Sequence, residues 1–391
     1  MTYDFTTVFN RRDHASLKWS GPQSELPMWI ADMDYQTAPE IIAAMQAKVA
    51  TGIFGYETVS EDYYTAVMDW YQSQHHVSLA REWLLFSNGV MPALTAIIRE
   101  LTNVGDNVVL QAPVYNMFDE TLAATGRHAV SADLVYDAAT HRYHIDFDTL
   151  KAQLAKPATT AMILCNPHNP IGRIWTRDEL IQIATLCQAA HVLLLADEIH
   201  GDLALGDHAY ISTASLPEAL RANIITLISP GKTFNLAALH AGTVIVYNAT
   251  LRKRVAVALK RHHSAEPNLL AQTGTIAAYT KGAAWVAALR EALTANYHTT
   301  AAAVADIPGL ALVPSDATYL AWLDVSALTH DSSAMTDWLS NTVQLRLNPG
   351  AEYHGNGHDF LRLNFATPPS LLNDGLARLK QGLAMYAAAQ H

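Results

Sequence analysis

The sequence contains few cysteines and few charged residues. Cys165 and Cys187 are the only cysteines among 391 residues, too few for a disulfide framework or for a structural zinc site built from cysteine ligands. Charged residues make up 16% of the chain, whereas hydrophobic residues make up 50%. This composition supplies a large core and differs from that of disordered proteins.

Basic tracts and long apolar runs are also missing. The formal net charge is -11, and the basic groups on one expected helix, Arg252–Arg254 and Lys260–Arg261, are short, so we expect no nucleic-acid partner. Residues 1–5 lack a basic segment followed by an apolar one, and no apolar run approaches the roughly 18 residues that span a bilayer. We therefore expect a soluble, cytoplasmic protein without a membrane partner.

Histidine, in contrast, is abundant, with 18 residues. The pairs His75–His76 and His262–His263 are adjacent in the sequence, so their side chains diverge on a helix. His141 and His144 lie in a polar stretch that offers no obvious third ligand. Because a metal site needs three or four convergent ligands, we expect surface histidines and no metal.

Apolar strand-like runs alternate with helical patterns along most of the chain. The expected strands are residues 83–86, 108–110, 161–165, 192–196, 224–228 and 243–247, with helices at about 61–74, 93–101, 177–190 and, after the last strand, 251–305. Strands that are apolar on both faces and alternate with helices indicate a largely parallel sheet covered on both sides, that is, an α/β fold.

The last hundred residues differ from this pattern. Strand-like segments at 310–313, 319–323 and 360–364 alternate with helices at about 332–341 and 370–389, which predicts a smaller α+β domain. A chain of 391 residues also exceeds the size of a single core. We expect an N-terminal segment (1–45) associated with the small domain, a large domain (46–285) and a C-terminal small domain (286–391).

The N-terminal segment contains one unusual stretch, Trp29–Tyr35, in which two acids alternate with apolar residues. A strand edge with outward acids and a functional motif both account for it. The residues that follow, Thr37 to Glu40, predict a helix that begins with a cap and an early proline at Pro39.

Polar or glycine-rich motifs follow five of the expected strands. In a parallel sheet, ligands bind beyond the carboxyl ends of the strands, so these motifs should converge on one edge of the sheet. They are Ser87–Gly89, Ala112–Tyr115, Asn166–Gly172, Asp197–His200 and Ser229–Lys232.

One interpretation of these motifs is a P-loop NTPase, with Gly231–Thr233 as the end of a phosphate loop and Asp197–Glu198 as the magnesium-binding acids. A phosphate loop needs a glycine five positions before Gly231, where this chain has Thr226,. The acid also precedes the lysine, the reverse of the usual order. We therefore disfavour this interpretation.

Binding of pyridoxal phosphate explains the residues at more of these strand ends than the phosphate-loop interpretation does. Burial of Lys232 just past an apolar strand favours a neutral, nucleophilic amine, and Asp197 is suited to keeping a pyridine nitrogen protonated. The glycine-containing turn 88–90 opens a helix and offers backbone donors to a phosphate. Tyr115 is placed to stack on the cofactor ring, and Asn169 to hold its phenolic oxygen.

Five motifs together resemble a known family: Trp29–Tyr35, Asn166–Trp175, Asp197–His200, Lys232–Leu236 and Arg362–Ala366. They are similar to those of fold-type I pyridoxal-phosphate enzymes of the class I/II aminotransferase superfamily and, more narrowly, of its MalY/PatB-like cystathionine β-lyase (C–S lyase) branch. The resemblance covers nearly the whole chain. It implies a three-layer αβα large domain with a mostly parallel seven-stranded sheet, and a smaller α+β domain.

The resemblance also implies roles for individual residues. Lys232 would be the catalytic residue and covalent cofactor anchor, Asp197 the partner of the pyridine nitrogen, and Arg362 a two-pronged ligand of the substrate carboxylate. The other implied contacts are Asn88, Gly89, Val90 and Ser229 with the phosphate, Tyr115, Asn169 and His200 with the rest of the cofactor, and Trp29 and Asn169 with the substrate. Tyr56 would reach the cofactor of the neighbouring subunit, which implies a homodimer with shared active sites.

Three positions depart from the usual aminotransferase pattern. His200 replaces the tyrosine that many aminotransferases have three residues after the aspartate, and the lyase branch shares this histidine. His240 stands where a phosphate-binding arginine is common, and Pro230-Gly231 replace the usual small residues before the lysine. The first departure favours the lyase branch. The second leaves the phosphate with fewer fixed charges, and the third concerns the shape of the loop that carries Lys232.

The function implied by the resemblance is a carbon–sulfur β-lyase that uses pyridoxal 5'-phosphate. It would cleave L-cystathionine, and other cysteine S-conjugates, by α,β-elimination to a thiol such as homocysteine, pyruvate and ammonia. One alternative is an aminotransferase on the same fold. A second is a non-catalytic regulatory protein that binds the cofactor for sensing.

Overall fold

The large sheet contains seven strands in the order β2-β10-β9-β8-β7-β3-β4. The computed structural model describes residues 3–389, so Met1 and Thr2 of the expected N-terminal segment lie outside the described residues. The strands are β2 (Leu84–Ser87), β3 (Asn107–Leu110), β4 (His128–Ser131), β7 (Thr159–Cys165), β8 (Leu193–Asp197), β9 (Ile224–Ile228) and β10 (Gly242–Ile245). Only β10 runs against its neighbours, which confirms the predicted, mostly parallel seven-stranded sheet.

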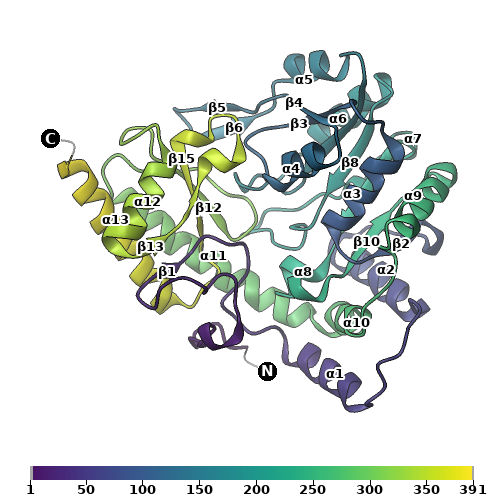
Figure 1. Cartoon of the computed structure of the whole chain (residues 1–391), viewed down its shortest axis with the longest axis horizontal. Coiled ribbons are helices and arrows are strands. Elements are labelled where there is room, and N and C mark those ends of the chain that lie inside the picture. The colour runs from purple at the N-terminus through teal and green to yellow at the C-terminus, as the bar shows by residue number, and fades with distance from the viewer. Residues whose placement is uncertain (1–2, 390–391) are drawn as a thin grey trace.

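Helices cover both faces of this sheet, because successive side chains of each strand point to opposite sides. In β7, Ala161 and Ile163 pack into a cluster with residues of α3 (Val90–Leu101), α4 (Met117–Ala124) and α9 (Ala249–Arg261). Met162 and Leu164 pack instead with residues of α5 (Phe147–Leu154) and α6 (Arg177–Ala189). The predicted αβα layering is therefore confirmed (Figure 1).

A smaller antiparallel sheet lies beside the large one (Figure 1). Its strands are β11 (Ala311–Leu312), β12 (Leu320–Asp324), β15 (Phe360–Asn364) and β14 (Asn348–Pro349), in that order across the sheet. Three helices accompany it: α11 (Ala283–Ala305), α12 (Ser332–Val343) and α13 (Pro369–Ala389). This arrangement is the predicted α+β part, while the domain boundaries at residues 45 and 285 stay predictions.

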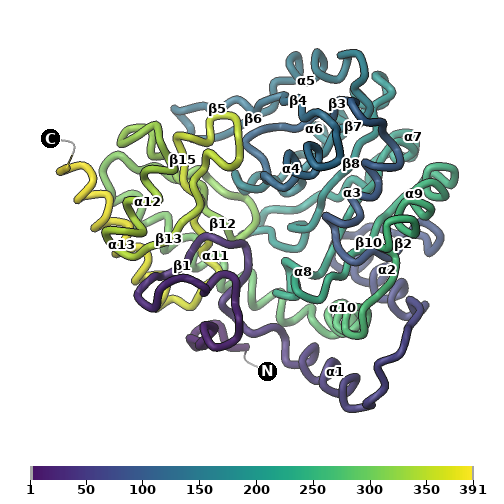
Figure 2. Tube along the Cα trace, in the orientation of Figure 1, coloured from purple at the N-terminus to yellow at the C-terminus, as the bar shows by residue number. Residues whose placement is uncertain are grey.

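The N-terminal segment joins the C-terminal part through a short parallel pair, β1 (Leu26–Pro27) with β13 (Leu345–Arg346). Figure 2 shows this segment in purple beside the C-terminal elements. Helix α1 (Pro39–Ala50) then begins at Pro39 as predicted, but the expected cap is wrong: Ala38 occupies the N-cap and no side chain caps the helix. The hydroxyl of Thr37 is buried without a hydrogen-bond partner among the described residues.

Residues 51–60 connect α1 to α2 (Glu61–His75) without regular structure. Ile53, Phe54 and Tyr56 are exposed there, at 72%, 64% and 110% of their reference areas. Apart from short 3-10 turns, the remaining elements are the hairpin β5 (Val135–Asp137) and β6 (Arg142–His144), and the helices α7 (Glu218–Arg221), α8 (Pro230–Thr233) and α10 (Ala271–Lys281). Within residues 3–389, no helix has the length and apolar character needed to cross a membrane.

Candidate active site

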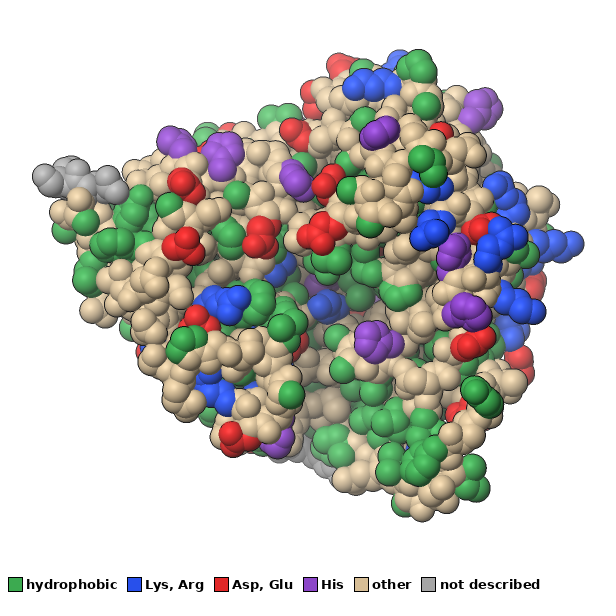
Figure 3. All heavy atoms as spheres, in the orientation of Figure 1, with side chains coloured by type: hydrophobic (Ala, Val, Ile, Leu, Met, Phe, Trp, Pro, Cys, Tyr) green, Lys and Arg blue, Asp and Glu red, His purple; other side chains and the backbone are tan. Residues whose placement is uncertain are grey.

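A cavity of about 510 Å³ opens at the carboxyl edge of the large sheet. Figure 3 shows this hollow between the two parts of the molecule, with Lys or Arg side chains inside it. It brings together all but one of the residues predicted for the site: Trp29, Asn88, Gly89, Val90, Tyr115, Asn169, Asp197, His200, Ser229, Lys232 and Arg362. The exception is Tyr56, whose side chain is fully exposed outside the cavity.

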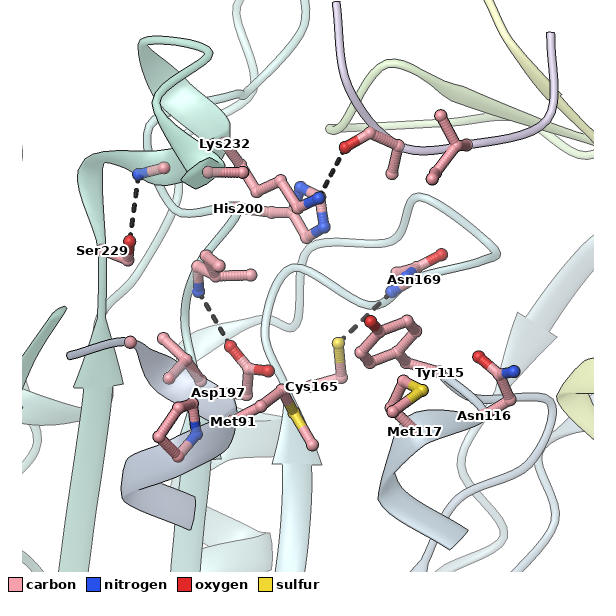
Figure 4. A pocket seen from close by; sticks show the side chains of 18 of the residues that line it. Met91, Tyr115, Asn116, Met117, Cys165, Asn169, Asp197, His200, Ser229 and Lys232 are labelled. Atoms are coloured by element: carbon pink, nitrogen blue, oxygen red, sulfur yellow. Dashed lines mark hydrogen bonds between the residues drawn. The ribbon is translucent and has the colours of Figure 1, made fainter. Parts of the chain in front are cut away.

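Lys232 lies on α8, a single helical turn directly after β9. Ser229 caps this turn by accepting a 3.0 Å hydrogen bond from the backbone N–H of Gly231. The amine of Lys232 donates a 2.5 Å hydrogen bond to the carbonyl of Ala31 (Figure 4). Burial, reinforced by the positive charge of Arg362, lowers the pKa of Lys232 to about 8. About a tenth of the amine is therefore neutral at pH 7, far more than for an ordinary lysine.

Asp197 ends β8 and is only 4% exposed. Its carboxylate accepts a 3.1 Å hydrogen bond from the backbone N–H of Ile199, visible below Lys232 in Figure 4. Burial raises the pKa of Asp197 to about 7, although Ile199 and Lys232 act in the opposite direction. When burial raises the pKa of a carboxyl group in this way, a nearby cationic or hydrogen-bond-donating partner stabilises its ionised form.

Arg362 points from β15 of the small sheet into the cavity and is 4% exposed. Its guanidinium donates to the side-chain oxygen of Asn169 at 3.2 Å and to the carbonyl of Trp29 at 2.9 Å, and it lies 5.0 Å from the ring centre of Tyr353. Nε is buried without a partner among residues 3–389. This planar group is suited to a two-pronged contact with a carboxylate.

Two ring side chains in the cavity are held uncharged. Burial lowers the pKa of His200 to about 3, and the positive charges of Lys232 and Arg362 add to the effect. Burial likewise raises the pKa of Tyr115 to about 12. Both rings are therefore neutral near pH 7, and Tyr115 presents an uncharged aromatic face across the cavity from Lys232 (Figure 4).

The turn between β2 and α3 depends on Gly89, which has a φ of 129°, a conformation that L side chains rarely adopt. Gly242 on β10 lies against it, since a Cβ at position 242 would come within 3.1 Å of the Gly89 carbonyl carbon. The backbone N–H of Asn88 is already bonded to the carbonyl of Ser264 at 2.8 Å. The start of α3, from Val90 onward, supplies the backbone donors of this corner.

Several cavity residues were not predicted from the sequence. His240 lies on the wall of the cavity, so the histidine that stands where an arginine is common does face the site. Met91, Asn116, Met117, Cys165, Asn348, Glu352 and Tyr353 also line it. Methionines and loop polar residues of this kind occur throughout the sequence, so no local pattern singles them out.

The histidines need one correction. In the described residues 3–389, no three His, Cys, Asp or Glu side chains form a potential metal site. The expectation of surface histidines is nevertheless wrong for His168 and His200, which are 1% and 3% exposed. It is also wrong for His75, whose side chain is 5% exposed and whose Nε2 lies 2.8 Å from a carboxylate oxygen of Asp202. Asp202 also accepts a 2.8 Å hydrogen bond from Thr233, next to Lys232, so His75 helps to support α8.

Comparison with known proteins identifies the family. A family model described as aminotransferase class I and II matches residues 27–379. The chain belongs to the aminotransferase class I and II family. The phosphate-loop interpretation of Gly231–Thr233 is therefore wrong, and the lysine at this strand end belongs to a different kind of site.

Individual relatives match this chain over nearly their whole length. Cystathionine beta-lyase PatB of Bacillus subtilis is 35% identical over 376 residues, covering 94% of this chain and 97% of PatB. The protein MalY of Escherichia coli is 33% identical over 386 residues, covering 96% and 98%. The crystal structure of a PLP-bound putative aminotransferase from Clostridium difficile 630 has a TM-score of 0.94 and 32% identity, covering 98% of this chain and 100% of that chain. The predicted family, its MalY/PatB-like branch and the fold class are confirmed.

Proposed function

We propose that this protein is a carbon–sulfur β-lyase that uses pyridoxal 5'-phosphate and cleaves L-cystathionine. The observation that carries the proposal is the convergence of the Lys232 amine, the buried Asp197 carboxyl group and the Arg362 guanidinium on one cavity. The names of the relatives support it: PatB is called a cystathionine beta-lyase, and the similar crystal structure is described as PLP-bound.

The residues present fit this cofactor. Three buried polar atoms of the cavity, on Asn88, His200 and Arg362, have no hydrogen-bond partner among the described residues, and buried polar groups are normally paired. Lys232 would hold the aldehyde end, Asp197 the ring nitrogen, and the start of α3 with Ser229 the phosphate. Pyridoxal phosphate supplies an electron sink that stabilises negative charge on the carbon next to a substrate amine.

The protein's own residues account for the first chemical step. Arg362 would bind the substrate α-carboxylate with its two-pronged guanidinium, which orients the α-hydrogen. Lys232 would then take that hydrogen as a proton onto its neutral amine, which a pKa of about 8 keeps available,. The neutral ring of His200 adds no competing positive charge beside this amine.

The bond that breaks next is the one between the β-carbon and sulfur. Its electron pair leaves with the sulfur as a thiolate, which takes up a proton to become homocysteine. Hydrolysis of the remaining three-carbon fragment by one water molecule gives pyruvate and ammonia, so cystathionine plus water equals the three products. The cavity walls formed by Met91, Met117 and Tyr115 are compatible with an apolar thioether.

We also propose a cytoplasmic homodimer with shared active sites. The connection 51–60 exposes Ile53, Phe54 and Tyr56 on one protomer, and adjacent large apolar groups on a surface commonly mark an interface. Tyr56 would reach the phosphate in the partner subunit. The domain division at residues 45 and 285 belongs to the same proposal.

One assay separates the lyase from its closest rival, an aminotransferase. The purified holoenzyme is incubated with L-cystathionine in the absence of any 2-oxo acid, and pyruvate and free thiol are measured. We expect equal amounts of both, and no formation in the Lys232→Ala variant. Turnover that requires a 2-oxo acid would establish transamination instead, and a cofactor-bound protein without either reaction would favour the regulatory alternative.

A further inference from the structure

Five consecutive backbone carbonyls, those of residues 29–33, are held by side chains from distant parts of the chain. We call this stretch the carbonyl ladder. Its acceptor–donor pairs are Trp29 with Arg362 (2.9 Å), Ile30 with Asn364 (2.7 Å), Ala31 with Lys232 (2.5 Å) and Tyr319 (3.0 Å), Asp32 with Asn364 (2.6 Å), and Met33 with Asn235 (3.0 Å). Two of these donors, Lys232 and Arg362, are the groups that the proposed reaction uses.

The carbonyl ladder has no regular secondary structure of its own. The backbone geometry of this stretch is therefore set by side-chain contacts rather than by a helix or strand. The acids of the Trp29–Tyr35 motif hold it in place through their ion pairs. Asp32 and Asp34 form a cluster of ion pairs with Arg11 and Lys18. The acids of the Trp29–Tyr35 motif therefore lie neither on a strand edge nor in the substrate cavity.

The cluster is compact and its charges balance. The Lys18 amine lies 2.8 Å from a carboxylate oxygen of Asp34, and these side chains are 0% and 5% exposed. Arg11 bridges both acids, at 2.7 Å to Asp32 and 2.8 Å to Asp34, and the indole N–H of Trp19 donates to Asp34 at 2.8 Å. Burial raises the pKa of Asp34, but the contacts with Lys18, Trp19 and Arg11 together outweigh it and the net pKa is lowered. Asp34 therefore stays ionised.

The same cluster is joined directly to the ladder. The Lys18 amine also donates to the carbonyl of Asp32 at 3.2 Å, Arg11 donates to the carbonyl of Met33 at 3.0 Å, and the carbonyl of Lys18 accepts from the indole of Trp29 at 3.2 Å. Removing one partner of a buried pair leaves an uncompensated charge, which displaces the surrounding backbone or admits water. A change at Lys18 should therefore move the carbonyls of residues 29–33.

We propose that Lys18 and Asp34 are positioning residues for the reaction, because they fix the carbonyl ladder that places the Lys232 amine and the Arg362 guanidinium. The inference rests on the proposed function for its kinetic readout only. A misplacement of about 1 Å at a catalytic group costs up to about 100-fold in rate. Neither residue touches the cavity, so the effect would act entirely through the ladder.

The test compares holoenzyme variants Lys18→Met and Asp34→Asn with a matched surface control, Arg81→Gln, which removes the exposed pair of Arg81 with Glu61. Three quantities are measured: kcat and KM for cystathionine, the kinetic isotope effect with the α-deuterated substrate, and amide hydrogen exchange at Met33 and Asp34. These amides are bonded to Asn235 and to the carbonyl of Ala366.

For Lys18→Met we expect kcat to fall about 10- to 100-fold, the isotope effect to rise because proton removal becomes slower relative to later steps, and the two amides to exchange faster. Exchange in β9 and α3 should stay unchanged, as should every quantity in Arg81→Gln. A fall in kcat with an unchanged isotope effect and unchanged KM would overturn the proposal, since it would mean only that less protein is folded. Faster amide exchange with normal kcat would overturn it as well.

A milder variant covers the possibility that Lys18→Met does not fold. Arg11→Gln acts at the partly exposed end of the cluster, where the side chain is 24% exposed, and should shift all three quantities in the same direction by a smaller amount. Arg11→Lys keeps the charge and should recover part of the loss. If neither Arg11 variant changes the isotope effect or the two amides, the proposal fails.

A further measurement separates this proposal from the proposed function. Exchange of the α-hydrogen of L-alanine with D2O needs carboxylate binding and proton removal but no leaving group. A wild-type protein that exchanges this hydrogen yet releases no thiol from cystathionine would refute the lyase and leave the positioning role testable. A variant that retains normal exchange of this hydrogen would refute the positioning role alone.

Discussion

Arg362 donates a 3.2 Å hydrogen bond to the side-chain oxygen of Asn169, 193 residues earlier in the chain. Arg362 lies on β15 of the small sheet and Asn169 follows β7 of the large sheet. This one contact links the two sheets across the cavity, so the position of the guanidinium depends on both parts of the molecule. Any change in their relative position would be felt at the predicted carboxylate contact.

Replacing Arg362 by lysine should weaken substrate binding. Lysine keeps the positive charge but offers a point charge instead of a planar fork, and the loss of one charge-assisted hydrogen bond raises KM about 10- to 100-fold. The value of kcat should change less, because the contact is made equally in the ground state and the transition state. Steady-state kinetics with cystathionine measures both; Arg261→Lys, at an exposed pair with Glu100, is the control.

The lowered pKa of Lys232 predicts how fast the cofactor attaches to the protein. Attachment requires the neutral amine, so in cofactor-free protein its rate should rise about tenfold per pH unit below the pKa of about 8 and level off above it,. Nα-acetyl-lysine, with an unperturbed pKa of about 10.4, should show a rate that still rises at pH 9. Stopped-flow absorbance follows both reactions. A plateau reached only above pH 10 would contradict the effect of burial on Lys232.

The raised pKa of Asp197 predicts a pH-dependent cost in stability. Without the cofactor, the folded protein holds a proton at Asp197 up to about pH 7, whereas the unfolded chain releases it near pH 4. The free energy of unfolding therefore falls as pH rises between these values, by on the order of 4 kcal/mol. Asp197→Asn should remove this fall and be increasingly stabilised relative to wild type from pH 4 to 7, while losing activity as holoenzyme.

Urea titrations of cofactor-free protein at several pH values measure this difference. Asp374→Asn, at an exposed pair on α13, should follow the wild-type profile. A constant difference between Asp197→Asn and wild type across the pH range would show that Asp197 is ionised throughout.

Shared active sites predict complementation between two inactive variants. Tyr56→Ala would damage the partner's site, and Lys232→Ala its own, so a mixed dimer has one site with both changes and one with neither. Random mixing by co-expression should restore about a quarter of the wild-type sites, since half of the dimers are mixed. Pyruvate release from the mixture measures the effect, and each variant alone is the control. No recovery, in a mixture shown to contain mixed dimers, would mean that the sites are not shared.

The sequence predicted the strand ends well for a physical reason. A buried parallel strand is apolar on both faces, so β9 could be located at Ile224–Ile228 without error. Once strands are located, parallel direction alone brings their carboxyl ends together, and this is why Asp197, Asn169 and Lys232 were correctly expected in one place. Arg362 lies on β15 of the small sheet, so the argument from the strand ends of the large sheet could not predict it. Only the family resemblance did.

Other features gave no comparable signal. Strand β4 is the edge of the large sheet, and its burial is slight along its whole length, so His128–Ser131 lacks the double-sided apolar pattern of its neighbours. The carbonyl ladder was missed because backbone carbonyls are the same at every position. What the sequence did offer there was the pair Asp32 and Asp34, whose partners Arg11 and Lys18 are revealed only by the folded chain.

The carbonyl ladder also has a consequence for biosynthesis. Translation delivers the ladder first, the large sheet with Lys232 next, and Arg362 and Asn364 last. A growing chain therefore holds its complete cofactor-anchoring sheet while two of the ladder's donors are still inside the ribosome, and domains commonly fold as they emerge. The reactive lysine would thus be folded before Arg362 reaches the cavity, and slow translation of the codons between Lys232 and Arg362 would prolong that interval.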